Sequence, residues 1–384
     1  MRDMLIQEAS GLFSGCVLKI YNFETHKEQT IVHGYAEVKP NQILMNEGTV
    51  FDVASLTKSF TAVLVYQALE AGLLQLNDTI SSLDSRFKQL DDVSVLDLLN
   101  HRILTWTDGF LSKAATKEEF ESILFSAKSL ERTRKYIDTN YIILSTVLET
   151  IHHKSFKTLI EELFRKCNMK RSSFGMTHLE CASNNYGNSG EQSITDREVG
   201  VVHDPKANHA YAFGTYTGHA GIFSTAGDML SFLKALFVDF TLLKKETITN
   251  MLNHDDIDFE NEQKIRNFAL SEQIIIPEEL DLSDMLSFLK EKIDITELEN
   301  NIARTYNYFG TRYYNNTIKN YDAPNVSNGE SIYFSGFTGS AYFIDFKKKN
   351  IIILMTNILH MATLERRERY QKIVTIFEKI NNYL

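Results

Sequence analysis

Residues 49–72, TVFDVASLTKSFTAVLVYQALEAG, decide the fold of this 384-residue chain. After the short strand-like segment TVFDV, the stretch from Ser55 onward is apolar on nearly every side of a helix. Gly72, at its end, is a typical helix stop. A helix that is apolar all round is buried, so we expect this one to lie in the centre of a domain.

Ser55 and Lys58 stand at the start of this helix, three residues apart, so their side chains share a face. A serine hydroxyl becomes a strong nucleophile only beside a base, and a lysine amine can be that base only when burial keeps it neutral. The helix start also offers free backbone N–H groups that can stabilise an oxyanion. The same spacing also occurs by chance in long chains, and Ser55 would then be an ordinary N-cap.

Segments rich in β-branched and aromatic residues lie at both ends of the chain, which predicts strands there. CVLKIYNF (16–23) and QTIVHGYAEV (29–38) form one pair, and a hairpin joined by KKKN connects SIYFSGFTGSAYFIDF (331–346) to NIIILMTNIL (350–359). We therefore predict an α+β fold in which strands from both ends form an antiparallel sheet.

Apolar residues spaced three and four apart predict helices between the two groups of strands. The segments are VSVLDLLNH (93–101), KEEFESILFSA (117–127), YIILSTVLETIHH (141–153), FKTLIEELFRKC (156–167) and AGDMLSFLKALFVDF (226–240). Residues 183–221 read as a long ordered loop. We predict one lobe with the sheet from residues 1–54 and 301–384, and a mainly helical lobe from 55–300 with an acidic helical insertion near 255–300.

The composition excludes several classes of protein. A formal net charge of −10 opposes binding to a phosphate backbone, so nucleic acid is not an expected partner. The cysteines, at 16, 167 and 181, are too few and too far apart for a disulfide framework or a structural zinc site. The chain shows neither a signal peptide nor a membrane span, which predicts a cytoplasmic protein. The oligomeric state is left open.

Several motifs resemble one known family and occur in its order. FDVASLTK (51–58) is followed by KYIDTNYIILSTVLE (135–149), VVHDPKANHAYAFGTYTGHAGIFSTAGDM (201–229) and GFTGSAYFIDF (336–346). Together they resemble the serine β-lactamase and penicillin-binding-protein superfamily, and within it the class C β-lactamase and esterase branch. The resemblance covers most of residues 12–240 and 330–384 and implies a β-lactamase/transpeptidase-like fold.

The resemblance also implies catalytic roles. The nucleophile of the family corresponds to Ser55, its lysine to Lys58 and the tyrosine of its second motif to Tyr136, which would act as a phenolate or as a relay with Lys58. The family usually has asparagine where this chain has Asp138. That carboxylate offers no amide donor and, near Lys58, would favour the charged amine. Without the family, we would interpret Tyr136 as a packed aromatic residue. Asp138 could equally cap the helix that starts near Asn140.

The third motif departs from the family pattern. The family usually has Lys or His, then Thr or Ser, then Gly; here Phe334, Ser335 and Gly336 stand at those positions. A phenyl ring cannot hold a substrate carboxylate, which weakens the case for penicillins and peptidoglycan peptides. Gly336 permits close backbone approach, and the N–H of Phe337 matches the second oxyanion donor of the family.

The sequence thus predicts a serine hydrolase, esterase-like, that cleaves a neutral or hydrophobic small-molecule ester or amide, or a peptide, without cofactor or metal. One alternative is a DD-peptidase, β-lactamase or acyl transferase, for which Arg304 or Arg312 would replace the missing cation. Another is a penicillin-binding-protein-like binding or regulatory protein without turnover. His203, Asp204 and His219 have no fixed metal spacing, so we expect them to order a loop.

Overall fold

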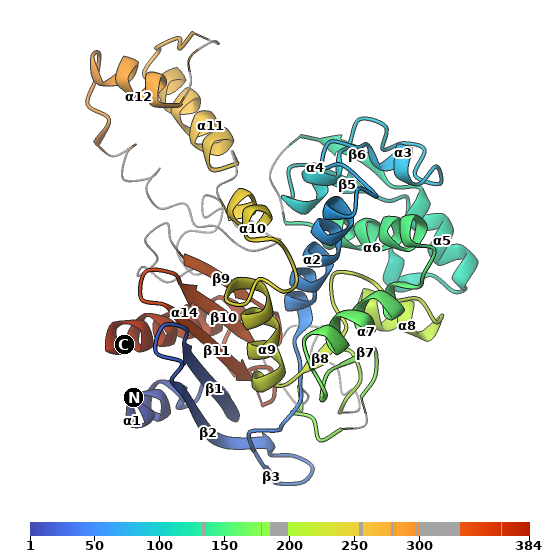
Figure 1. The fold of residues 1–384 in the computed structure, drawn as a ribbon, viewed down its shortest axis with the longest axis vertical. Coiled ribbons are helices and arrows are strands. Elements are labelled where there is room, and N and C mark those ends of the chain that lie inside the picture. Colours follow the sequence, from blue (N-terminus) through green and yellow to red (C-terminus); the bar gives the residue numbers. More distant parts are fainter. Residues whose placement is uncertain are drawn as a thin grey trace.

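A six-stranded antiparallel sheet, built from both ends of the chain, is the centre of the fold (Figure 1). The computed structural model describes residues 1–132, 136–177, 179–184, 199–252, 256–277, 280, 282–296, 298, 331–361 and 363–384. The sheet order is β3-β2-β1-β11-β10-β9. Its strands are β1 (Gly15–Asn22), β2 (Glu28–Glu37), β3 (Ile43–Leu44), β9 (Ser331–Ser335), β10 (Ala341–Asp345) and β11 (Asn350–Thr356). The predicted α+β class and the sheet from both chain ends are confirmed.

The register of the sheet follows from its hairpins. Asp345 lies opposite Asn350, so the turn between them closes β10 onto β11 as predicted. Strand β11 also pairs with β1, with Leu18 opposite Leu354, and this pairing joins the two ends of the chain. All seven residues of β11 are buried, which fits its run of isoleucine, leucine and methionine.

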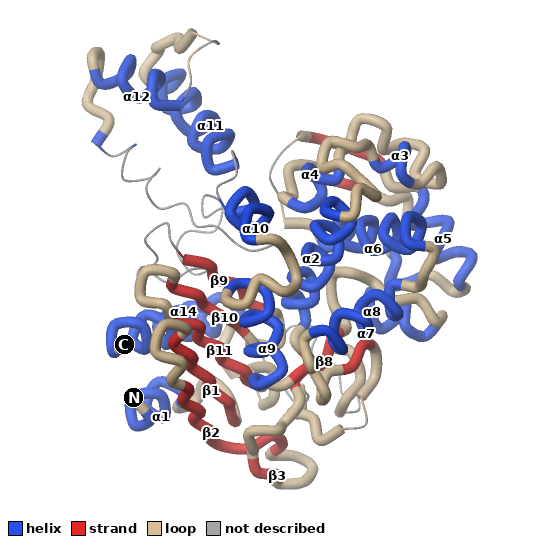
Figure 2. Tube along the Cα trace, viewed as in Figure 1, coloured by secondary structure: helices blue, strands red, loops and turns tan. Residues whose placement is uncertain are grey.

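Helices cover both faces of the sheet (Figure 2). Helix α9 (Ala226–Phe237) packs against β1 and β11. Helix α14 (Arg366–Tyr383) packs on the sheet through Phe377, whose ring contacts those of Tyr333 and Phe343. The N-terminal helix α1 (Arg2–Ala9) packs against α14. The side chains of successive strand residues point to opposite faces, so Tyr342 points away from Phe343, toward the nucleophile side.

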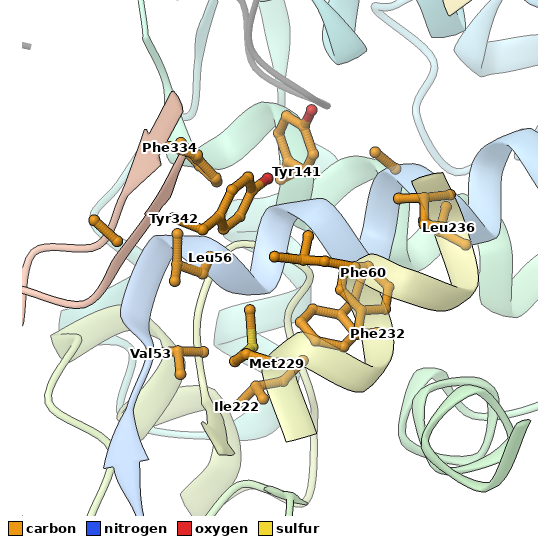
Figure 3. Packing of buried hydrophobic residues seen from close by; sticks show 14 of the residues in the cluster. Val53, Leu56, Phe60, Tyr141, Ile222, Met229, Phe232, Leu236, Phe334 and Tyr342 are labelled. Atoms are coloured by element: carbon orange, nitrogen blue, oxygen red, sulfur yellow. The ribbon is translucent and has the colours of Figure 1, made fainter. Parts of the chain in front are cut away.

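Helix α2 (Thr57–Glu70) is the buried helix that the sequence predicts. The ring of Phe60 stacks on that of Phe232 in α9 with centroids 4.0 Å apart (Figure 3). On another side α2 packs against α6 (Asp138–His152) and α7 (Phe156–Lys166). Ser59 Oγ lies 2.9 Å from the hydroxyl of Tyr342, so α2 is also tied to the sheet.

The remaining elements are short strands, which form two small sheets, and further helices. Two small sheets have the orders β4-β8-β7 and β5-β6. The elements not yet named are β4 (Phe51–Asp52), η1 (Ala54–Leu56), α3 (Ile80–Leu83), α4 (Val95–Leu99), β5 (Leu104–Trp106), η2 (Leu111–Lys113), α5 (Lys117–Phe125), β6 (Lys128–Glu131), β7 (Ser173–Phe174), α8 (Pro205–Ala212), β8 (Ile222–Ser224), α10 (Lys245–Leu252), α11 (Asp256–Ser271) and α12 (Leu282–Lys290). Within the stretch expected to be a loop, α8 forms because Asp204 caps it and Pro205 suits a first helical position.

The acidic insertion is helical where the structure describes it. Helices α11 and α12 pack on each other and stand apart from the sheet in Figure 1. They share an apolar cluster of their own, formed by Ile265, Ala269, Ile276, Met285, Leu289, Ile295 and Leu298.

The boundaries of the two predicted lobes stay a prediction. Helix α9, which the sequence assigned to the helical lobe, packs on the sheet. Within the described ranges no helix combines the length and apolar composition that a membrane crossing needs.

Candidate active site

Ser55 follows a strained turn at the end of β4. Ala54 has a φ of 46°, in the left-handed region that residues with a Cβ rarely adopt. Asp52 holds the turn in place, because its carboxylate accepts hydrogen bonds from the backbone N–H of Ala54 and of His203, each at 2.8 Å. The carbonyl oxygen of Asp52 accepts a further bond from the Thr338 hydroxyl at 2.6 Å. Two segments distant in the sequence, at His203 and at Thr338, therefore hold the turn in place.

Ser55, Lys58 and Tyr136 come together as the sequence predicts. Ser55 lies in the 3₁₀ turn η1, which leads directly into α2, and side chains three residues apart along such a helix share a face. The distance from Lys58 Nζ to Ser55 Oγ is 3.1 Å. The Tyr136 hydroxyl donates a hydrogen bond to Ser55 Oγ at 2.9 Å. The serine oxygen thus lies within hydrogen-bonding distance of an amine and a phenol.

Lys58 is completely buried but does not lie in an apolar pocket. Its Nζ donates hydrogen bonds to Asp138 Oδ1 at 2.9 Å and to the His219 carbonyl oxygen at 3.2 Å. It also lies 4.7 Å from the centroid of the Tyr136 ring. A carboxylate at this distance stabilises the charged amine. Apolar burial alone therefore does not describe the surroundings of this lysine, and Asp138 is the reason.

Asp138 begins α6 and is shared by two lysines. Its second oxygen, Oδ2, accepts a hydrogen bond from Lys206 Nζ at 2.7 Å. Burial alone would raise the pKa of Asp138, but the charges of Lys58, His219 and Lys206 hold that pKa well below its usual range. The carboxylate is therefore ionised at neutral pH. Lys206 lies within the motif 201–229, but the sequence assigned it no role; the fold brings it in from the first turn of α8.

Asp204 and His219 complete the charged cluster. His219 Nε2 lies 2.9 Å from Asp204 Oδ1, which also accepts the backbone N–H groups at the start of α8. The ring of the neighbouring His203 stacks on that of Phe337, with centroids 5.5 Å apart. Asp138, Asp204 and His219 each bring one potential metal-ligand atom within 4.8 Å of the others. We assign no metal there, because each oxygen of Asp138 already accepts a hydrogen bond from a lysine Nζ.

Tyr136 is held as a neutral phenol. Burial and the charge of Asp138 raise the pKa of this phenol well above its ordinary value. Its ring packs on that of His101, with centroids 4.8 Å apart, and His101 Nδ1 accepts the backbone N–H of Ile137 at 3.2 Å. His101 itself has a φ of 51°, so this supporting contact also rests on an unusual backbone conformation.

A family match agrees with this geometry. The family model for Beta-lactamase matches residues 23–375, which is most of the chain. This chain belongs to the beta-lactamase family. The predicted superfamily is therefore confirmed, and the members of the family are serine hydrolases.

Individual relatives of this beta-lactamase family member are distant. A putative D-alanyl-D-alanine carboxypeptidase from Salmonella enteritidis is 25% identical over 248 residues, which are 55% of this chain and 57% of the relative. The chain thus spans little more than half the length of that relative. Among solved structures, EstCE1, a hydrolase with promiscuous acyltransferase activity, has a TM-score of 0.65 and 16% identity, with 98% of this chain and 96% of EstCE1 covered. A class C beta-lactamase from Rhodobacter sphaeroides has a TM-score of 0.59 and 14% identity, with 98% and 97% covered. These two structures show the fold alone.

The third motif of this beta-lactamase family member lies beside the nucleophile turn. A Cβ added to Gly336 would lie 2.4 Å from the Val53 carbonyl oxygen, so only glycine permits this approach. Phe334 is 2% exposed and packs edge-on against Tyr342 (Figure 3), whereas Ser335 is partly exposed. Phe334 therefore lies in the core near α2, where it offers neither charge nor donor.

An arginine that the sequence analysis did not single out lies near this motif. The guanidinium of Arg366, at the start of α14, lies 5.0 Å from the centroid of the Phe337 ring and 5.7 Å from that of Tyr370. Arg366 is exposed, and its charge is close enough to oppose the rise in the pKa of Tyr136. The arginines that the sequence suggested, Arg304 and Arg312, lie outside the described residues.

Proposed function

We propose that this chain is an esterase-like serine hydrolase that cleaves a neutral or hydrophobic ester or amide through an acyl-enzyme on Ser55. The observation that carries the proposal is the position of Ser55 Oγ, 3.1 Å from Lys58 Nζ and 2.9 Å from the Tyr136 hydroxyl. The lack of a cation at Phe334 favours an uncharged substrate.

In the first step the oxygen of Ser55 bonds to the substrate carbonyl carbon, and neutral Lys58 takes the serine proton. The N–H groups of Ser55 and Phe337 would stabilise the oxyanion that forms. Tyr136 then gives its phenolic proton to the leaving group as the scissile bond breaks, and the ammonium of Lys58 restores that proton. The raised pKa of Tyr136 supports this relay over a resting phenolate. Water releases the acyl group by the reverse sequence of proton transfers.

Intact-mass measurements test this proposal. We expect the wild-type chain to gain one fluorophosphonate adduct and to hydrolyse a short-chain nitrophenyl ester, and the Ser55→Ala variant to do neither. Ester turnover that persists in Ser55→Ala would contradict the mechanism. A stable penicillin adduct would instead favour the peptidase alternative, and no adduct with any probe would favour a binding protein without turnover.

A second candidate function rests on Arg366. Its guanidinium lies over the ring of the residue that would supply the second oxyanion donor, Phe337, so it can reach a carboxylate on a bound substrate. A peptidase that removes a C-terminal residue would need such a cation. The name of the Salmonella relative, a putative D-alanyl-D-alanine carboxypeptidase, agrees with this reading.

Arg366→Gln separates the two candidates. If the substrate carries a free carboxylate, KM should rise about tenfold for it and stay nearly constant for a neutral ester, because an exposed charged hydrogen bond is partly screened. Steady-state kinetics on an acyl-D-alanyl-D-alanine peptide and on a nitrophenyl ester measure the difference. Arg165→Gln, at an exposed arginine near the end of α7, is the control. Equal effects of Arg366→Gln on both substrates would exclude the carboxylate role.

A further inference from the structure

We propose that Lys206 is a positioning residue that cancels the charge of Asp138 and thereby allows Lys58 to release its proton. The inference deepens the proposed function, on which it rests, because only a neutral Lys58 can accept the Ser55 proton. It concerns a residue to which the sequence assigned no role and that acts through Asp138 rather than on the substrate.

Asp138 divides its two oxygens between two cations. Oδ1 lies 2.9 Å from Lys58 Nζ, and Oδ2 lies 2.7 Å from Lys206 Nζ. The side chains differ in exposure: Lys58 is 0% exposed, Asp138 24% and Lys206 32%. Lys206 therefore neutralises the carboxylate from the more open side and leaves the buried side to Lys58.

The charge balance explains why a second cation matters. A buried lysine that faces one unneutralised carboxylate keeps its proton, since loss of the proton would leave the carboxylate without a counterion. With Lys206 bound to the same carboxylate, deprotonation of Lys58 leaves a neutral Asp138–Lys206 pair. Lys58 then releases its proton to solvent as the pH rises, and the neutral amine can receive the proton of Ser55.

The start of α8 keeps Lys206 in place and charged. Asp204 accepts the backbone N–H groups of Lys206 and Ala207, each at 2.9 Å, and so caps the helix. Burial opposes the charge of Lys206, but the carboxylates of Asp138 and Asp204 raise its pKa above the ordinary value. Lys206 thus carries a constant positive charge over the pH range in which the site works.

Other ionisable groups also face Lys58 or the carboxylate that it shares. They come from the segment before α6, from α6 itself, from the N-terminus of α8, from the segment before β8 and from the start of α14. They are Tyr136, Tyr141, Asp138, Asp204, Lys206 and His219, together with Arg366, whose charge acts on Tyr136. Of these, Lys206 is the one that donates a hydrogen bond to the carboxylate of Asp138 among the described contacts, in addition to the bond from Lys58 itself.

The rate of fluorophosphonate labelling as a function of pH tests the proposal on the full chain. In Lys206→Met, the pH of half-maximal labelling should rise by about one unit, and labelling at pH 7 should fall about tenfold. Lys206→Arg, which keeps the charge, should stay within about threefold of wild type. Lys154→Met, at an exposed lysine paired with Glu162, is the control for loss of a lysine elsewhere.

A double variant distinguishes charge compensation from a purely structural role. Asp138→Asn removes the charge that Lys206 compensates, so Lys206→Met combined with Asp138→Asn should return the half-maximal pH to the wild-type value or below it. A half-maximal pH that does not move in Lys206→Met, or that stays raised in the double variant, would overturn the proposal.

Failure of the proposed function would be visible separately. If wild-type Ser55 takes no fluorophosphonate, the hydrolase proposal fails, while the titration of Lys58 still tests Lys206. NMR of chains labelled with ¹³C at lysine Cε records that titration, and Lys58→Met identifies the resonance. We expect the Lys58 midpoint to rise by about one pH unit in Lys206→Met, and an unchanged midpoint would contradict the role of Lys206.

Discussion

Lys58→Met should lower kcat for nitrophenyl ester hydrolysis by about 10²–10⁴-fold while the chain stays folded. The variant removes the proposed acceptor of the Ser55 proton but keeps an unbranched side chain of similar length in the buried space. Asp138 would not be left as an isolated buried charge, because Lys206 Nζ still lies 2.7 Å from its other oxygen. Steady-state kinetics and thermal melting measure the two effects.

Lys154→Met is again the matched control, because it removes an exposed lysine whose ion pair with Glu162 contributes little. It should retain wild-type kcat. Activity near the wild-type level in Lys58→Met would show that another group accepts the serine proton. A melting temperature that falls while activity per folded molecule is retained would lead to the same conclusion.

Gly336→Ala should lower kcat by about 10²–10³-fold, the amount expected for loss of one oxyanion donor. The added Cβ would lie 2.4 Å from the Val53 carbonyl oxygen, a distance at which one backbone segment must move. Movement of the end of β9 displaces the N–H of Phe337 from the turn that carries Ser55. Because the donor acts on the transition state, KM should change much less than kcat.

Gly227→Ala is the control for a glycine in a regular helix. Its added Cβ would meet only the Thr225 hydroxyl, at 3.8 Å, near the start of α9. We expect unchanged kcat and a slight gain in stability, because alanine favours the helix more than glycine does. If Gly336→Ala behaved in the same way, the close contact between β9 and the nucleophile turn would have no catalytic role.

Local patterns allow the sheet, the buried helix and the SxxK pair to be predicted from the sequence. Apolar residues alternate along a strand and recur every three or four positions along a helix, so the pattern of hydrophobicity alone predicts these elements. The spacing of Ser55 and Lys58 fixes their contact, since it lies within one turn. The role of Tyr136 could be predicted only from the family resemblance. Tyr136 and Ser55 are 81 residues apart, so no local pattern predicts their contact.

The contacts of Lys206 and Arg366 could not be predicted, because they arise only when separate segments pack together. Lys206 reaches a carboxylate 68 residues away, after a stretch that read as loop and contains a capped helix. Asp204 followed by Pro205 was a usable signal for that helix, since aspartate and proline favour its first positions. Nothing in the sequence around Arg366 distinguishes it from the other charged residues of an amphipathic helix.

The helical pair α11 and α12 has an apolar interior that shares none of its described residues with the large core around α2. The burial of apolar surface therefore stabilises each of the two interiors largely independently of the other. We therefore expect the polypeptide to unfold as two cooperative units of unequal size. Heat or denaturant can open the smaller unit while the surroundings of Ser55 remain assembled, so loss of helical signal and loss of turnover need not coincide.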